Sequence, residues 1–215
     1  MQTELNKVES IPMATTHSLM IRVTLNDVQP VVWRTLNVPN SKDLLALAVG
    51  TFLSMGWEAN APFHYLLPNG GKVVDPRQWM ELDDDSKVRI APANASGQDL
   101  KAYFSNGPMK LVYETPIPWS LELTWDALGT ERNADEGIFV EFGAYAGPPQ
   151  WCGGAEGYRF LCETLAQPNS PDYKEVVETL YQPFNPNFFS VGYTNDLMGV
   201  NAKQMEEAYC TEDED

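Results

Sequence analysis

The chain has 215 residues, 43% apolar and 11% aromatic, which is enough to bury a core and too apolar for a generally disordered chain. Its formal net charge is −16, and the acid is concentrated in the second half: residues 1–100 carry 8 Lys/Arg against 11 Asp/Glu, and residues 101–215 carry 6 against 19. A surface of that sign repels phosphate backbones, so we expect no direct nucleic-acid binding. No apolar run reaches the about 18 residues of a membrane span. The polar N-terminus also lacks the pattern of a secretory signal, so we expect a cytoplasmic location.

Residues 1–17 are polar and aperiodic, which favours a flexible leader. From Ser18 to Leu25 apolar and polar residues alternate, the period of a half-buried strand. After a turn, Val31 to Val38 is predicted as the antiparallel return strand. Apolar residues then repeat at helical spacing between Leu44 and Met55, which predicts a helix that ends before Gly56.

Further strands are predicted at 63–67, 87–90, 109–114, 119–125 and 138–142, with an exposed acidic loop at 83–85. Beyond Gly143 the pattern indicates helices at 155–166 and from 170, a short aromatic turn at 185–191 and a weak segment at 194–209. We therefore predict a single α+β domain over 18–209, sheet-rich over 18–143 and helical over 144–209. An acidic tail follows at 210–215.

Four blocks of sequence carry a resemblance to a known protein family. They are Pro30-Val31-Val32-Trp33-Arg34, Gly56-Trp57, Phe63-His64-Tyr65 and Cys152-Gly153-Gly154. In this order they resemble the plasmid pRiA4b ORF-3-like family, from about Ser18 to about Phe189. Members are often described as passenger proteins of insertion elements or as TnpR-like. The resemblance implies an α/β roll with a β-grasp-like ββα start, whose mixed or antiparallel sheet is packed by C-terminal helices.

The chain departs from the family pattern at two places. The family has an acidic, glycine-bearing turn followed by Trp and His; here the turn carries Pro116 and Pro118, Trp119 is kept, and Leu121 stands at the His position. An acidic residue precedes the family's Cys-Gly-Gly, and here it is Trp151. The departures imply that a polar or metal-binding site built from those groups is lost, so no metal and no cofactor is expected.

Catalytic candidates are few. His64 is the only histidine outside the expected leader, and Cys152 beside two glycines could be a thiol nucleophile with His64 as its base, if the fold brings them together. Packing explains both residues as well. The arginines are scattered, which argues against a resolvase, and the stretch 153–157 lacks the lysine of a P-loop, so we interpret its glycines as a turn with positive φ.

Trp151 is the candidate for an exposed binding residue, with Tyr158, Tyr113 and Trp119 as further candidates. Our leading hypothesis is a non-enzymatic interaction protein, associated with a mobile element, whose acidic half meets a basic protein partner, in its sharpest form by mimicking nucleic acid. Two alternatives stay open: a hydrolase or thiol-dependent enzyme centred on Cys152 and His64, and a small-ligand pocket lined by Trp151, Tyr158 and Tyr113.

Overall fold

The computed structural model describes residues 15–95, 99–133, 136–180 and 183–199. The strands are β1 (Thr15–Leu25), β2 (Trp33–Pro39), β3 (Phe63–Leu66), β4 (Lys72–Val74), β5 (Ala91–Pro92), β6 (Met109–Tyr113), β7 (Trp119–Asn133) and β8 (Phe139–Ala144). The helices are α1 (Leu44–Ser54), α2 (Pro76–Glu81), α3 (Asp84–Lys87), the 3-10 helix η1 (Leu100–Phe104), α4 (Gly154–Leu165) and α5 (Tyr173–Thr179). Residues 191–199 are also helical.

The described strands form one eight-stranded sheet in the order β5-β4-β3-β6-β7-β1-β2-β8. Neighbouring strands are antiparallel except for the parallel pair of β4 and β5, so the sheet is mixed. The expected ββα start is confirmed: β1 pairs with β2, from Ser18 opposite Pro39 to Thr24 opposite Trp33, and α1 follows. The predicted α+β class is therefore correct.

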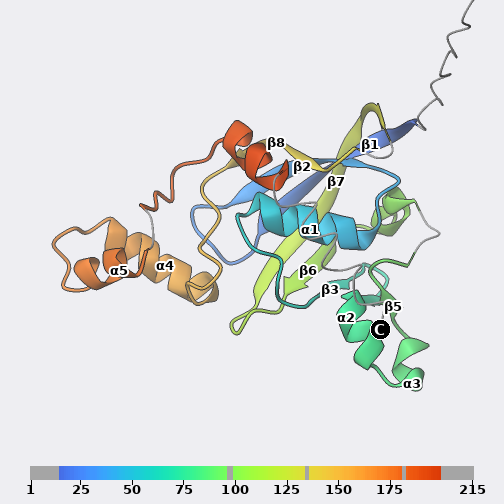
Figure 1. The fold of residues 1–215 in the computed structure, drawn as a ribbon, viewed down its shortest axis with the longest axis horizontal. Helices are drawn as coiled ribbons and strands as arrows, with labels where there is room; N and C mark the ends of the chain where they lie inside the picture. The colour runs from blue at the N-terminus through green and yellow to red at the C-terminus, as the bar shows by residue number, and fades with distance from the viewer. Residues whose placement is uncertain (1–14, 96–98, 134–135, 181–182, 200–215) are drawn as a thin grey trace, which may run out of the picture.

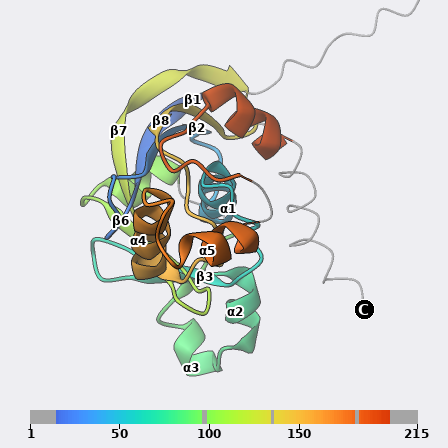
Figure 2. The same ribbon diagram turned by 90° about the vertical axis from the view of Figure 1, so that its left-hand side faces the viewer.

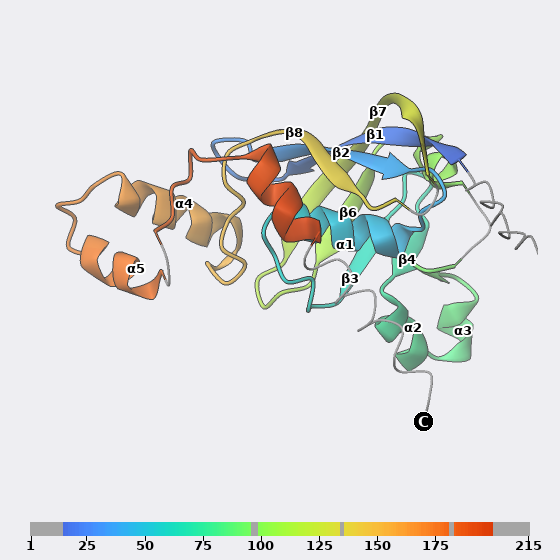
Figure 3. The same ribbon diagram turned by 45° about the horizontal axis from the view of Figure 1, so that its top comes forward.

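The core lies between the sheet and α1, which runs along one side of the sheet (Figure 3). Alternate residues of β1 are fully buried, as the period of two requires. Helices α4 and α5 extend from one end of the molecule and α2 and α3 lie toward the other (Figure 1), while a view turned by 90° places α4 and α5 in front of α1 (Figure 2).

Arg34 of the Pro-x-x-Trp-Arg block is a structural residue. Its side chain is buried and donates from Nε to Ser54 O at 3.0 Å, at the end of α1. Its Nη1 donates to Trp33 O and to Ala144 O, at 2.8 and 3.0 Å. The ring of Phe189 lies 4.0 Å from the guanidinium carbon. Burial lowers the pKa of Arg34 to about 10, so the group stays charged at neutral pH and joins α1, β2 and β8.

The prediction of a strand at 87–90 is wrong. Asp83 caps a short helix, because its Oδ1 accepts a hydrogen bond from Ser86 N at 2.7 Å, and α3 occupies the position of the expected acidic loop. Val88, which suggested a buried strand position, is 85% exposed. Neither β4 nor α2 was predicted, although Asp75-Pro76 is a good helix start.

The ends of the domain differ from the prediction. Strand β1 begins at Thr15, and Thr15, Thr16 and His17 pair with β7, so residues 15–17 of the expected leader belong to the sheet, while residues 1–14 lie outside the described residues. The expected aromatic turn at 185–191 is largely irregular, and helix begins at 191. Most of the predicted segment 194–209 and the whole acidic tail lie outside the described residues. In the part of the chain that is described, no helix is both long and apolar enough to cross a membrane.

Candidate functional site: an aromatic cleft

A cleft of about 890 Å³ opens where four stretches of chain meet. They are 55–58 after α1, 115–117 between β6 and β7, 146–154 before α4, and the C-terminal residues 180 and 183–193. We call this the aromatic cleft. Four large apolar side chains in its lining are more than half exposed: Ile117, Trp151, Phe188 and Tyr193. A cluster of this kind on one concave surface is typical of a binding site.

The floor of the aromatic cleft is the segment 146–150, which core aromatics hold from below. Tyr158 Oη donates to Ala146 O at 3.4 Å, Trp57 Nε1 to Pro148 O at 2.8 Å and Trp119 Nε1 to Gln150 O at 3.3 Å. Every second carbonyl of the segment therefore accepts a bond from a buried ring. Two of these rings also pack against each other, since the Trp57 and Trp119 rings are stacked with centroids 5.4 Å apart. The floor is thus continuous with the core.

A polar network borders the cleft. Asn60 is its centre: Asn60 Oδ1 accepts from Tyr113 Oη at 3.1 Å and from Gln150 Nε2 at 2.9 Å, and Asn60 Nδ2 donates to Glu58 Oε2 at 2.7 Å. The backbone N–H of Glu58 donates to Gln150 Oε1 at 2.9 Å. Among the described residues that line the cleft, Glu58 is the only charged one, and these contacts fix its position.

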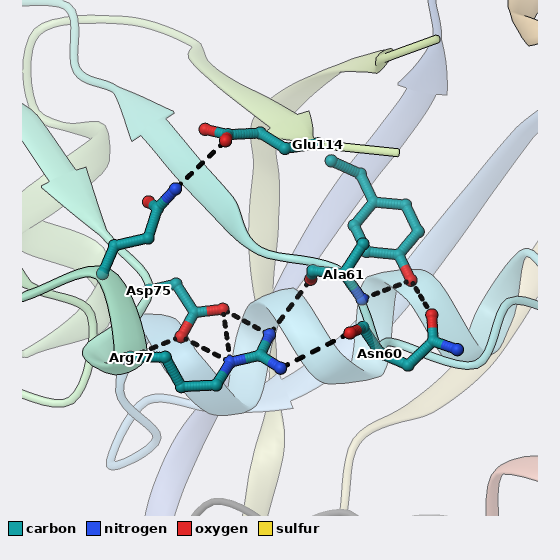
Figure 4. Close-up of polar contacts among 7 residues, drawn as sticks. Asn60, Ala61, Asp75, Arg77 and Glu114 are labelled. Carbon is teal, nitrogen blue, oxygen red and sulfur yellow. Dashed lines mark hydrogen bonds and ion pairs between the residues drawn. The ribbon is translucent and has the colours of Figure 1, made fainter. Parts of the chain in front are cut away.

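An ion pair between the buried Asp75 and the partly exposed Arg77 supports this network from behind (Figure 4). Asp75 is fully buried and its Oδ2 accepts from Arg77 Nη2 at 2.6 Å. The same guanidinium donates to the carbonyls of Asn60 and Ala61, at 3.4 and 3.1 Å. The segment 60–61 is therefore held between Arg77 on one side and the Tyr113 hydroxyl on the other. Sequence reasoning missed Asn60, Asp75 and Gln150, because nothing in the local pattern links positions 90 residues apart.

Of the four predicted binding aromatics, the structure leaves only Trp151 exposed, and it lines the cleft. Tyr158, Tyr113 and Trp119 are buried. Neither Tyr158 nor Tyr113 is among the residues that line the aromatic cleft, because both rings are part of the core. The Tyr158 hydroxyl contacts Ala146 O of the floor, and the Tyr113 hydroxyl contacts Asn60 Oδ1 and Ala61 N. Tyr158 therefore holds the floor of the cleft, and Tyr113 holds its polar network.

The two catalytic candidates lie on opposite sides of the sheet. His64 alternates with the buried Phe63 and Tyr65, so it faces away from α1, and its Nδ1 contacts Glu114 Oε1 at 2.5 Å. Cys152 follows the cleft floor, which is bonded to rings on the α1 side. The Sγ of Cys152 has Gly154 O as its acceptor, at 4.0 Å. This arrangement does not support a Cys152–His64 pair.

Burial raises the pKa of the Cys152 thiol to about 12, so the reactive thiolate is scarce at neutral pH. We therefore expect Cys152 in the folded protein to react with iodoacetamide at pH 8 at least about tenfold more slowly than in urea. Mass spectrometry of the peptide that contains Cys152 measures the two rates. Fast alkylation of Cys152 in the native protein, with an apparent pKa of its thiol below about 8, would instead support the hypothesis of a thiol-dependent enzyme.

The interpretation of the glycine-rich stretch as a turn is confirmed for Gly153 and Gly154, whose φ angles are +91° and +70°. Gly157 serves close packing instead, since a Cβ there would lie 1.7 Å from Cys152 O. The described residues contain no group of three or more His, Cys, Asp or Glu side chains that could hold a metal ion.

The two departures from the family pattern meet in the aromatic cleft. Pro116 and Ile117 of the first and Trp151 of the second all line it. Leu121, at the position of the family's histidine, is fully buried. Where the resemblance implies acidic residues, this chain therefore presents apolar side chains to one concave surface.

Comparison with known proteins agrees with the fold. The chain matches the family described as plasmid pRiA4b ORF-3-like protein over residues 17–192. It is 28% identical over 160 residues to the uncharacterised protein y4hQ of Sinorhizobium fredii (strain NBRC 101917 / NGR234), which covers 73% of this chain and 77% of that protein. Its fold is similar to the crystal structure of MM3350, a protein of unknown function from Methanosarcina mazei Go1, with a TM-score of 0.70, 19% identity, and coverage of 83% of this chain and 98% of that one. Because the family match spans most of the chain, this protein belongs to the plasmid pRiA4b ORF-3-like family.

Proposed function

We propose that this protein is a binding protein that takes an extended apolar segment of a partner protein into the aromatic cleft. The observation that carries the proposal is the gathering of four exposed apolar side chains, Ile117, Trp151, Phe188 and Tyr193, in one cleft. Large aromatic side chains supply contact area at a low cost in conformational entropy, and they dominate the binding energy of many interfaces.

The size and rigidity of the cleft fit a peptide segment. Its volume lies within the range of about 300–1,000 Å³ typical of ligand sites, which suits a few side chains better than a broad protein face. The floor is fixed to the core by Trp57, Trp119 and Tyr158. A preformed site loses less entropy on binding, so this fixation favours affinity.

The charges around the cleft favour a basic partner. Helix α4 begins at the cleft, and α4, α5 and their connection carry more exposed acids than bases. The acids are Glu156, Glu163, Asp172, Glu175 and Glu178, against Arg159 and Lys174. Such a field steers basic segments toward the cleft and repels acidic ones, within a Debye length of about 8–10 Å.

Mimicry of a nucleic acid by a single array of acidic side chains is a less favoured form of this proposal. The exposed acids of the described residues are spread over several elements and loops, among them the segment after α1, α2, α3, β7, α4 and α5. These elements are at different ends of the molecule (Figure 1). Association with a mobile element and a cytoplasmic location stay predictions.

Removing the indole of Trp151 tests the proposal. The probe is an immobilised set of hexapeptides composed of proline, leucine, phenylalanine and lysine, with binding then measured in solution by fluorescence anisotropy. We expect Trp151→Ala to weaken the best-bound hexapeptides about thirtyfold, the effect of losing an interface residue worth about 2 kcal/mol.

Val88→Ala is the matched control, because Val88 is an exposed apolar residue outside the cleft lining. It should leave the affinity unchanged. If no hexapeptide binds, or if both substitutions weaken binding equally, the cleft is not a peptide site.

A further inference from the structure

We propose that Glu58 selects a lysine or arginine side chain in the bound segment. This inference rests on the proposed peptide binding and specifies its ligand. Glu58 is exposed and is the only charged residue among the described ones that line the aromatic cleft. Its Oε2 accepts from Asn60 Nδ2 at 2.7 Å, while its Oε1 has no hydrogen-bond partner among the described residues. One carboxylate oxygen is thus held, and the other is available to a cation.

The carboxylate is placed by groups that cannot easily move. Asn60 Oδ1 accepts from both Tyr113 Oη and Gln150 Nε2, which orients the Asn60 amide so that its Nδ2 meets Glu58. The Tyr113 ring is stacked on Phe52, with centroids 4.2 Å apart. Burial raises the pKa of Tyr113, so its hydroxyl keeps its proton and remains a donor at neutral pH. Tyr113 is therefore a positioning residue for Glu58.

The chemistry of the cleft matches a long side chain with a cationic end. Lysine and arginine lay their aliphatic stems along apolar surface and keep the charged group in a polar setting. The exposed indole of Trp151 offers an aromatic face to such a side chain, and Glu58 offers the opposite charge. Within the described part of the chain, no lysine, arginine or histidine lines the cleft to repel it. An acidic side chain at the same place would be repelled by Glu58.

A charge series in the ligand tests the inference. Each position of the best-bound hexapeptide is replaced in turn by lysine, norleucine or glutamate, and affinities are measured at low ionic strength. We expect one position at which lysine binds about fivefold more tightly than norleucine, since Glu58 is exposed. Glu58→Gln should abolish this preference without changing the affinity for the norleucine peptide, and Glu58→Lys should transfer the preference to glutamate.

Two further variants separate a specific contact from net charge and from folding. Asp84→Asn removes the same charge from an exposed side chain on α3, outside the cleft, and should keep the preference for lysine. Tyr113→Phe keeps the ring but removes the hydroxyl that orients Asn60, and should reduce the preference while the norleucine peptide binds as before.

The outcomes distinguish this inference from the proposed function. If the norleucine peptide binds and Trp151→Ala abolishes that binding, but lysine gives no advantage at any position, the role of Glu58 is refuted and the cleft function stands. A lysine preference that survives Glu58→Gln, or is lost equally in Asp84→Asn, also refutes it. If no hexapeptide binds the native protein, both proposals fail.

Discussion

Arg34→Ala is expected to lower the free energy of unfolding by about 3–5 kcal/mol. The substitution leaves the buried carbonyl of Ser54 and the partly buried carbonyl of Ala144 without their guanidinium donors, and it leaves a cavity beside Phe189. A buried carbonyl left unsatisfied costs about 1–3 kcal/mol. Because these carbonyls belong to α1 and to β8, their loss affects how the helix is attached to the sheet edge. Urea unfolding followed by tryptophan fluorescence measures the change.

Arg22→Ala is the matched control for this prediction. The Arg22 guanidinium also stacks on an aromatic ring, that of Trp33 at 4.0 Å, but Arg22 lies on a partly exposed position of β1. Its loss should cost less than about 1 kcal/mol. Arg34→Lys keeps the charge without the planar fork of donors, so it should lie between the two. Equal effects of Arg34→Ala and Arg22→Ala would contradict the structural role of Arg34.

The parts of the fold that sequence predicts well are those with a local period. The alternation from Leu19 to Leu25 and the helical spacing from Leu44 to Met55 led to β1 and α1, because each pattern reflects burial of one face. The strand predicted at 87–90 was wrong, because there the alternation does not reflect burial of one face. Val88 and Ile90 alternate with charged residues, but the cap at Asp83 starts a helix before any strand can pair.

The candidate site was only partly predictable, since it is made by contacts between distant segments. Trp151 was identified because it stands in a loop between a proline and Cys152. Glu58, Asn60 and Gln150 carry no local signal, and their connection depends on how the floor of the cleft returns to the end of α1. The buried aromatics show the limit clearly. Sequence indicated that Tyr113, Trp119 and Tyr158 were important, but it could not show that they contact the cleft only through its backbone and its polar network.

Gly147→Ala is expected to cost about 3 kcal/mol or more of stability and to disturb the cleft. A Cβ at this position would lie 2.0 Å from Met55 O and 3.0 Å from Met55 Cα, and both atoms belong to backbone at the end of α1. The clash cannot be relieved by rotating a side chain, so either α1 or the floor must shift. A shifted floor would also separate Pro148 O and Gln150 O from Trp57 and Trp119.

Gly192→Ala separates this close contact from the general effect of adding a methyl group. Gly192 lies in the helix at 191–199, and a Cβ there would meet no described atom within 4 Å, so alanine should stabilise by about 0.5–1 kcal/mol through helix propensity. Urea unfolding of both variants gives the difference. If Gly147→Ala is as stable as Gly192→Ala, the floor does not approach α1 as described, and the hydrogen bonds that fix the floor must be reconsidered. If it is folded but destabilised, it should also bind the hexapeptides more weakly than the native protein, because the rigidity of the floor and the affinity of the cleft depend on the same contact.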